Sequence, residues 1–279
     1  MAQPRPPGGG AEDALQRAMF ALNNQRPQEA EWIAAEVLKA DPRQAQALHI
    51  LGYALLMQGR ANDAIAALEP AARHLRDAEI DTQLALALRQ AGRQDDARAR
   101  LERAIKRKPP FAPAFYELGC LLHDLKRYDE AVEALSRGLE VAPAMPELSI
   151  QLGFAFLALR NYAGAKTAFA KALALAPNAA GALWGLGKAH QGLGENRPAI
   201  EYFRRCLLQT PDDAGTLLNL GHSLLEIGEL DAGYECFRKA ARGDQKRFSG
   251  ALATLVKSGR GRFWLKPSAA AKFLRGDNG

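Results

Sequence analysis

Five histidines and three cysteines are the residues of this chain best suited to acid–base, nucleophilic or metal chemistry. An imidazole titrates near neutral pH, and a thiolate is both a nucleophile and a metal ligand. Such chemistry needs partner groups at a fixed spacing, yet the sequence has no CxxC or HExxH pair, no GxSxG turn and no GxxxxGK[ST] phosphate loop. We therefore expect no catalytic residue, no metal site and no cofactor.

Simpler roles fit the positions of these residues. Free cysteines most often fill small buried positions, and we expect this of Cys120, Cys206 and Cys236 rather than a zinc site or disulfides. We expect His190 to be a packing residue with its hydrogen bonds satisfied. Three further histidines fall where a binding groove is predicted below, and there they either contact a ligand or remain in solvent: His49, His123 and His222.

Small and large residues recur along the chain with a period of about 34 residues. A Leu-Gly dipeptide comes first, a small residue follows twelve positions after the glycine, and a large apolar residue follows four positions later. A proline closes most blocks. The glycines are Gly52, Gly119, Gly153, Gly187 and Gly221; the small residues are Ala64, Ala131, Ala165, Ala199 and Gly233; the large residues are Leu68, Leu135, Phe169, Phe203 and Phe237; and the prolines are Pro42, Pro109, Pro143, Pro177 and Pro211.

This pattern predicts two helices in each block. A glycine inside a helix costs about 1 kcal/mol relative to alanine, so we expect a second helix to cross it closely through the small residue. We expect the large residue to fill the gap toward the next block. Glycines at 59, 92, 194 and 228 are placed to take the left-handed conformation between the helices, and the prolines end the second helices.

The order of small, large and proline positions resembles the tetratricopeptide repeat family over roughly residues 11–247. The resemblance implies an all-α fold, a right-handed α-solenoid of antiparallel helix pairs with a C-terminal capping helix, which serves as a non-catalytic protein-binding scaffold. We predict a disordered N-terminus (1–10), seven repeats (11–44, 45–77, 78–111, 112–145, 146–179, 180–213 and 214–247), a capping helix (248–258) and a basic tail (259–279) with a short helix capped by Ser268.

Four of the copies depart from the repeat pattern, and two of these departures lead to predictions about the structure. The first and third copies have Ala18 and Ala85 in place of the glycine. The second copy ends in Arg76 instead of proline, and the third has Asp81 where a large anchor is expected, which makes the joint between these two copies the least secure. The seventh copy ends in Gln245, so its second helix is expected to run on.

The resemblance also implies a binding surface, because in this family the first helices line the concave face. Positions three before and one after the glycine point into that groove, and Gln151 and Asn219, two before it, could reach a peptide backbone. The alternative is that the aromatic residues pack between neighbouring first helices. The predicted peptide-binding residues are Tyr53, Tyr116, Phe154, Trp184, Lys188, Asn219 and His222.

Family members that hold acidic C-terminal peptides of chaperones use repeated lysine and asparagine pairs, and certain glycosyltransferases carry a ladder of asparagines. Only Lys188 and Asn219 resemble the lysine and asparagine pairs. Asn219 is a single asparagine and not a series of them. The sequence therefore predicts a protein or peptide partner of another kind. An accessory subunit of a transferase, or of a secretion or envelope-assembly machine, is the alternative within the scaffold class.

The formal charge of +6 is unevenly distributed. Residues 238–279 hold 11 Lys and Arg against two Asp, which places +9 there and leaves −3 on the preceding residues. That balance disfavours nucleic acid along the repeats, although a cluster of basic residues at 98, 100, 103, 106, 107 and 108 motivates it as a less favoured reading. The tail could contact an acidic surface of a partner or anionic lipid, with solvated charge as the alternative.

The expected location of the protein in the cell rests on two features that the sequence lacks. Residues 1–10, MAQPRPPGGG, lack the apolar centre and cleavage site of a secretory signal. The sequence holds no run of about 18 apolar residues of the kind that crosses a membrane. We therefore expect a cytoplasmic protein.

Overall fold

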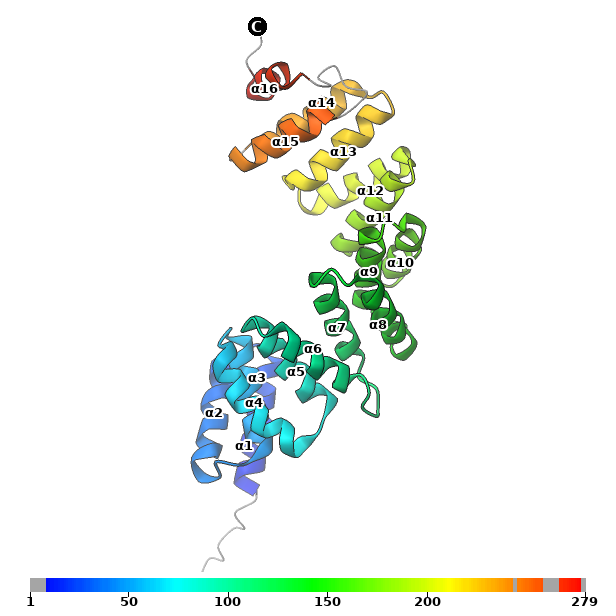
Figure 1. Cartoon of the computed structure of the whole chain (residues 1–279). Helices are drawn as coiled ribbons and strands as arrows, with labels where there is room; N and C mark the ends of the chain where they lie inside the picture. Colours follow the sequence, from blue (N-terminus) through cyan, green and yellow to red (C-terminus); the bar gives the residue numbers. More distant parts are fainter. Residues whose placement is uncertain (1–8, 243–244, 258–265, 277–279) are drawn as a thin grey trace, which may run out of the picture. The chain divides into compact units, whose positions relative to one another are not determined.

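The computed structural model describes residues 9–242, 245–257 and 266–276 (Figure 1). In this part of the chain sixteen α-helices and no strand are present, and none of the helices is long and apolar enough to cross a membrane. The helices are α1 (Gly9–Asn23), α2 (Pro27–Ala40), α3 (Ala45–Met57), α4 (Ala61–Leu75), α5 (Ala78–Gln90), α6 (Gln94–Ala104), α7 (Ala112–Asp124), α8 (Tyr128–Val141), α9 (Pro146–Ala158), α10 (Tyr162–Leu175), α11 (Ala180–Gly192), α12 (Asn196–Gln209), α13 (Ala214–Glu226), α14 (Leu230–Ala241), α15 (Gln245–Lys257) and α16 (Pro267–Arg275).

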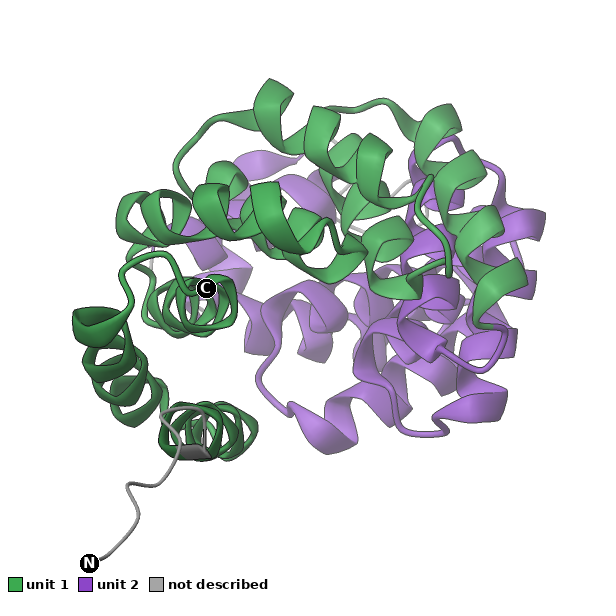
Figure 2. Cartoon of the chain, turned by 90° about the horizontal axis from the view of Figure 1, so that it is seen from below, with its two compact units in different colours: residues 1–142 green, residues 143–279 purple. Residues whose placement is uncertain are grey.

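The chain divides into two compact units, residues 1–142 and 143–279 (Figure 2). Within each unit, odd-numbered and even-numbered helices form consecutive pairs from α1–α2 to α13–α14, and each pair packs against the next. The first helices also contact one another in sequence, as α1–α3–α5–α7 in unit 1 and α9–α11–α13 in unit 2. This arrangement confirms the predicted all-α solenoid of helix pairs.

Short-range signals explain where the helices begin. The side chains of Asp77, Asn161 and Asp213 each accept a hydrogen bond from a backbone N–H in the first turn of α5, α10 and α13, at 2.7–2.9 Å. These caps satisfy N–H groups that the helix itself leaves unpaired. A proline stands in the first turn of α2, α7, α9 and α16, where no N–H is needed.

A residue with a left-handed backbone conformation follows the first helix of each pair. Gly59, Gly92, Gly194 and Gly228 have φ between 73° and 89°, as expected from the sequence. In the other three turns the residue at this position is Gln25, Lys126 or Arg160, with φ between 56° and 61°. The turn geometry is therefore the same in all seven pairs even where no glycine provides it.

Each pair is held at the mid-helix glycine. A Cβ on Gly119 would overlap Leu135, and a Cβ on Gly153 would lie 2.6 Å from the ring of Phe169. The large residue thus packs on the glycine of its own pair, and Phe169 also fills the space toward the next pair, where a Cβ on Gly185 would lie 2.3 Å from its ring. The close backbone crossing is seen directly at Gly221, where a Cβ would lie 3.0 Å from the carbonyl oxygen of Gly233.

Asp81 links the two helices of the third pair through ion pairs, where an apolar contact was expected. It is 0% exposed, and it receives Arg103 and Arg107 from the end of α6 at 2.6 and 2.8 Å. Helices α4 and α5 pack against each other beside it. The third pair, whose anchor position holds no large apolar residue, is therefore held together by ion pairs between Asp81 of α5 and arginines in and just after α6.

The ends of the chain differ from the sequence-based expectation. Gly9 and Gly10 belong to α1, whereas residues 1–10 were expected to be disordered, and residues 1–8 lie outside the described part. Helix α14 does not run on: Arg242 has an extended backbone, and α15 starts afresh at Gln245, earlier than the predicted 248. The last helix is preceded by Lys266 as its N-cap, not Ser268.

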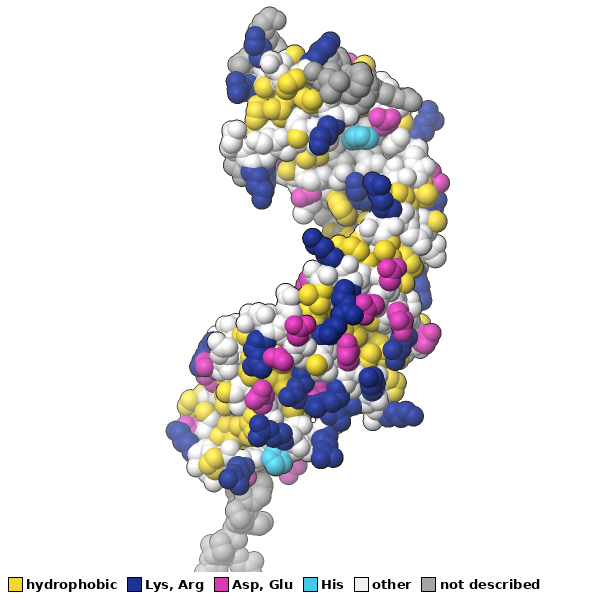
Figure 3. Space-filling model, viewed as in Figure 1, with side chains coloured by type: hydrophobic (Ala, Val, Ile, Leu, Met, Phe, Trp, Pro, Cys, Tyr) yellow, Lys and Arg dark blue, Asp and Glu magenta, His cyan; other side chains and the backbone are white. Residues whose placement is uncertain are grey.

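The predicted basic tail is partly a packed element. Helix α16 contacts α14 and α15, with Ala270 buried and the ring of Phe273 edge-on to Tyr234 at 5.5 Å. Arg238 stacks over Phe273 at 5.1 Å. Hydrophobic side chains gather over these C-terminal helices in Figure 3. Residues 259–265 and 277–279 of the predicted tail lie outside the described residues, as does residue 258, the last of the predicted capping helix.

Candidate functional site

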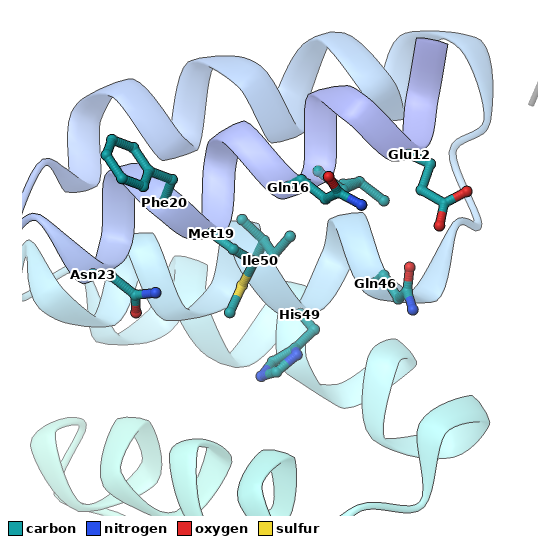
Figure 4. Close-up of a pocket in the computed structure, with 9 residues that line it drawn as sticks. Glu12, Gln16, Met19, Phe20, Asn23, Gln46, His49 and Ile50 are labelled. Atoms are coloured by element: carbon teal, nitrogen blue, oxygen red, sulfur yellow. The ribbon is translucent and has the colours of Figure 1, made fainter. Parts of the chain in front are cut away.

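A hollow with a volume of about 530 Å³ lies between the first helices α1 and α3 (Figure 4). Met19, Ile50 and His49 point toward one another at its centre. Its floor is formed by the apolar side chains of Leu15 and Ile50, which are 5% and 3% exposed. Its rim carries several amide groups. The lining residues are Glu12, Leu15, Gln16, Met19, Phe20, Asn23, Gln46, His49 and Ile50.

The hollow is bordered by large apolar side chains that face solvent. Phe20 is 66% exposed and Met19 is 39% exposed, both on α1. His49 is fixed from the opposite side, because its Nε2 lies 2.7 Å from Oε1 of Gln83 on α5. The site therefore combines a held imidazole, exposed apolar area and amide groups.

The repeat pattern could have predicted this hollow. Leu15 and Met19 stand three before and one after Ala18, which takes the glycine position of the first pair, and His49 stands three before Gly52. Applying the rule only to pairs with a glycine missed Leu15 and Met19. No sequence signal of this kind singles out Phe20.

A second hollow, of about 380 Å³, lies between the next first helices of unit 1, α5 and α7. Arg89 crosses it to Glu117 at 3.3 Å and to Asp124 at 3.2 Å. Burial raises the pKa of Glu117, and the Arg89 charge opposes that shift. The residues lining it are Leu86, Arg89, Gln90, Tyr116, Glu117 and Cys120.

The cysteine of this second hollow is a poor nucleophile. Burial, assisted by the charge of Glu117, raises the pKa of the Cys120 thiol to about 11. The thiolate is therefore scarce at neutral pH. Cys206 is buried as expected, whereas Cys120 and Cys236 are only half-buried.

The two tyrosines among the predicted binding residues lie in different surroundings. Tyr116 lines the second hollow from α7. Tyr53, on α3, is half-buried and packs against the buried cluster of α1, α2 and α3. Tyr53 is thus partly a packing residue.

In unit 2 the structure brings Phe154 and Trp184 together, with ring centroids 6.2 Å apart. Phe154 also meets Phe169 edge-on at 5.2 Å, and Trp184 packs against the buried cluster that contains Phe203 and Leu220. Both rings are half-buried. Trp184 is therefore not the freely exposed anchor that the sequence suggested, and the alternative of packing between first helices accounts for part of its surface.

Lys188 and Asn219 are hydrogen-bonded to each other. Lys188 Nζ donates to Asn219 Oδ1 at 3.1 Å and to Gln191 Oε1 at 2.9 Å. Gln191 in turn donates to Ser223 Oγ at 3.0 Å. Burial lowers the pKa of Lys188. The pair forms a polar link between α11 and α13.

The predicted histidines behave in three ways. His222 follows Asn219 on α13, and its Nδ1 is buried with no hydrogen-bond partner among the described residues. His123 is half-buried and meets Tyr128 edge-on at 5.2 Å. His190 is a buried packing residue, bonded to Glu195 and stacked on Tyr202 at 5.4 Å, as expected.

The chemistry available on these surfaces is that of binding. In the described part of the chain no group of three His, Cys, Asp or Glu side chains is placed to hold a metal ion. The first helices instead present apolar area beside amide, imidazole and ammonium groups. Such a surface can bury side chains of a ligand and pair with its backbone.

Solved structures with the same fold come from several proteins. The Pseudomonas aeruginosa protein pilF matches with a TM-score of 0.66 and 17% identity, over 75% of this chain and 94% of its own. PilW, described as a widely conserved type IV pilus biogenesis factor, matches with a TM-score of 0.66 and 19% identity, over 73% and 95%. YrrB, described as a protein with an unusual peptide-binding site, matches with a TM-score of 0.55 and 18% identity, over 66% and 95%.

Sequence comparison gives the family. No curated protein matches the chain significantly as a whole sequence. Two sequence profiles of the tetratricopeptide repeat do match, one at residues 15–78, 82–146 and 150–214 and the other at residues 214–246. These segments cover most of the chain and coincide with the helix pairs described above. The chain belongs to the tetratricopeptide repeat family.

Proposed function

We propose that this protein is a non-catalytic scaffold that binds a peptide or helix of a partner protein on the surface of its first helices. The observation that carries the proposal is the apolar hollow between α1 and α3, with Phe20 66% exposed at its edge. Exposed apolar area beside a concave site is typical of protein-binding surfaces. YrrB, a structural neighbour, is described as having a peptide-binding site.

The composition of the hollow favours a ligand with an apolar anchor. An inserted aliphatic or aromatic side chain would contact Met19 and Ile50, while Gln16, Asn23 and Gln46 are placed around it to pair with backbone groups. Glu12 at one end adds a negative charge, which favours a basic residue in the ligand.

The predicted residues of unit 2 are proposed as a separate contact surface. Phe154 and Trp184 keep part of their rings exposed, and Lys188, Asn219 and His222 follow on the next turns and the next first helix. A ligand here would first contact the apolar rings of Phe154 and Trp184 and then the polar side chains of Lys188, Asn219 and His222. Tyr53 and Tyr116 are proposed to contact ligand in unit 1 through their exposed portions.

An accessory subunit of a larger assembly is the second proposal within the scaffold class. PilW is described as a pilus biogenesis factor, and it shares the fold of this chain. The cytoplasmic location expected from the sequence remains a prediction, as does the absence of catalysis.

A displayed library of random peptides tests the proposal, with selection on the full-length protein. We expect the selected peptides to share an apolar anchor and to bind Phe20→Ser at least about tenfold more weakly than wild type, because anchor contacts commonly contribute ~2 kcal/mol or more.

Trp32→Ser is the matched control. Trp32 is also 66% exposed, but it lies on the second helix α2 and does not line the hollow. Equal binding of selected peptides to wild type and Phe20→Ser would show that the hollow is not the binding site.

A further inference from the structure

A third hollow in unit 1, of about 580 Å³, is lined almost entirely by arginine. It lies where α4 and α6 end: Arg73 is in the last turn of α4, Arg76 is its C-cap, and Arg103 is in the last turn of α6. The lining residues are Ala72, Arg73, Arg76, Arg100, Arg103 and Arg107.

Asp81 holds three of these guanidinium groups in place. Its carboxylate lies 3.6 Å from Arg100, 2.6 Å from Arg103 and 2.8 Å from Arg107, and its side chain is 1% exposed. A buried carboxylate that binds several arginines fixes their orientation without neutralising them all. The three side chains remain 25–51% exposed on the other side.

The remaining two arginines have no acidic partner. Arg73 and Arg76 are exposed, and among the described residues neither makes a salt bridge or hydrogen bond through its side chain. Five positive charges therefore line one hollow against the single charge of Asp81. The ends of α4 and α6 add about half a negative charge each, which leaves roughly three positive charges uncompensated.

Two departures from the tetratricopeptide pattern meet at this place. Arg76 stands where most copies have proline, and it takes a left-handed backbone with φ 40°. Asp81 replaces an apolar anchor, and the two residues are only five positions apart. Local rules of a fold are commonly broken where a site requires it, and here both exceptions serve the same arginine cluster.

We infer that this hollow binds a phosphoryl group. A phosphoryl group carries a charge of about −1.5 to −2 and three acceptor oxygens, so it can pair with several guanidinium groups at once. A carboxylate has one charge and two oxygens, so a second carboxylate beside Asp81 would leave more of this positive charge uncompensated than a phosphoryl group does. The group is either free phosphate or a phosphate ester on another molecule, since both present the same oxygens.

Calorimetry on the full-length protein at constant ionic strength tests the inference with four probes: inorganic phosphate, O-phosphoserine, serine and citrate. We expect phosphate and O-phosphoserine to bind, and serine and citrate not to bind. Tighter binding of O-phosphoserine identifies an ester as the ligand, and equal or tighter binding of phosphate identifies the free anion. Citrate binding as tightly as phosphate would overturn the assignment, because it would show a general anion surface.

The variant Arg73→Gln/Arg76→Gln removes the two unpaired charges and should weaken phosphate binding by about tenfold or more, since hydrogen bonds to charged groups are among the stronger ones. Its fold is checked by circular dichroism, and Arg76→Gly, which suits the left-handed backbone, serves as a second variant. Arg17→Gln/Arg43→Gln is the control, because both residues are exposed in the same unit and lie outside the hollow.

Equal loss of phosphate binding in the control would reduce the effect to overall charge and overturn the inference. A short single-stranded RNA that binds far more tightly than O-phosphoserine, and that loses affinity in the same arginine variant, would also overturn it in favour of nucleic acid.

Discussion

His222 shows what a single half-buried residue contributes to stability. Its ring is partly removed from water, and its Nδ1 has no hydrogen-bond partner among the described residues. Burial therefore lowers its pKa below the ordinary value of 6.5, with Glu226 opposing the shift and Lys188 reinforcing it. The neutral ring is the form that the folded state holds.

This shift predicts a loss of stability in acid. The unfolded chain takes up a proton at His222 before the folded chain does, so the contribution is fully present above pH 6.5 and falls as pH decreases through the lower folded pKa. The free energy of unfolding of His222→Gln, measured by denaturant titration, should fall less than that of wild type between about pH 7.5 and 5.5. Equal decreases in the two proteins would contradict the neutral buried ring.

Individual residues also mark where sequence reasoning worked and where it did not. The position rule singled out His49 and Tyr116, which line two of the hollows, because a fixed period places them on the same face of their helices. The role of Asp81 was not predicted, since its partners Arg103 and Arg107 lie more than twenty positions away and were considered only as a motive for nucleic-acid binding. Charge pairing between helices depends on packing that one sequence does not specify.

At the scale of the helix, the mid-helix glycine of each first helix leaves space that a large side chain of the second helix fills. Gly52, Gly119 and Gly153 face Leu68, Leu135 and Phe169 of their own pairs. The period predicted the close crossing and the large residue that fills a gap, but it did not show that this residue also packs on the glycine of its own pair. In the same way Ser268 looked like an N-cap, yet the helix starts at Pro267 with Lys266 as its N-cap, two residues earlier than expected.

A double-mutant cycle tests this contact. Gly119→Ala should destabilise by roughly 1–3 kcal/mol, because overpacking against Leu135 exceeds the gain in helix propensity. In the Gly119→Ala background, Leu135→Ala should cost much less than it does alone, because the new methyl group fills the space.

The control for the cycle is Gly250→Ala in α15, where nothing lies within 4 Å of the added methyl group. This variant should be stabilising by up to about 1 kcal/mol. Additive effects of Gly119→Ala and Leu135→Ala in thermal unfolding would show that the two residues do not share the space.

For the whole molecule, the end of the array is the feature that the sequence described least well. The missing proline after α14 suggested a continuous helix, whereas Gly243 in the sequence was the stronger stop signal. The solenoid itself was predicted correctly because five of the seven copies repeat the Leu-Gly pair and the residues that follow it. The final helices have no further copy to repeat them, so their packing could not be derived from the period.

Removing the Phe273 ring should therefore loosen the end of unit 2. Phe273→Ala loses the contacts with Tyr234 and Arg238 and should destabilise this end by roughly 2 kcal/mol. Since repeats are coupled mainly to their neighbours, hydrogen exchange should increase in α14 and α15 and stay unchanged in α1–α3.

Leu208→Ala provides the comparison within the same unit. Leu208 is 83% exposed on α12, so its truncation should leave exchange in α14 and α15 unchanged. Unchanged exchange in Phe273→Ala as well would show that α16 contributes nothing to the fold of this end.

Phe169 has a consequence for how the array responds to stretching. Its ring occupies the space over Gly153 of α9 and also the space over Gly185 of α11, so one side chain closes two contacts. Pulling α9 and α11 apart must withdraw the ring from at least one glycine and open an apolar void. Resistance to tension at this joint therefore has a threshold: the helices hold their spacing until the ring leaves one of the two glycines, and the joint then opens at that contact.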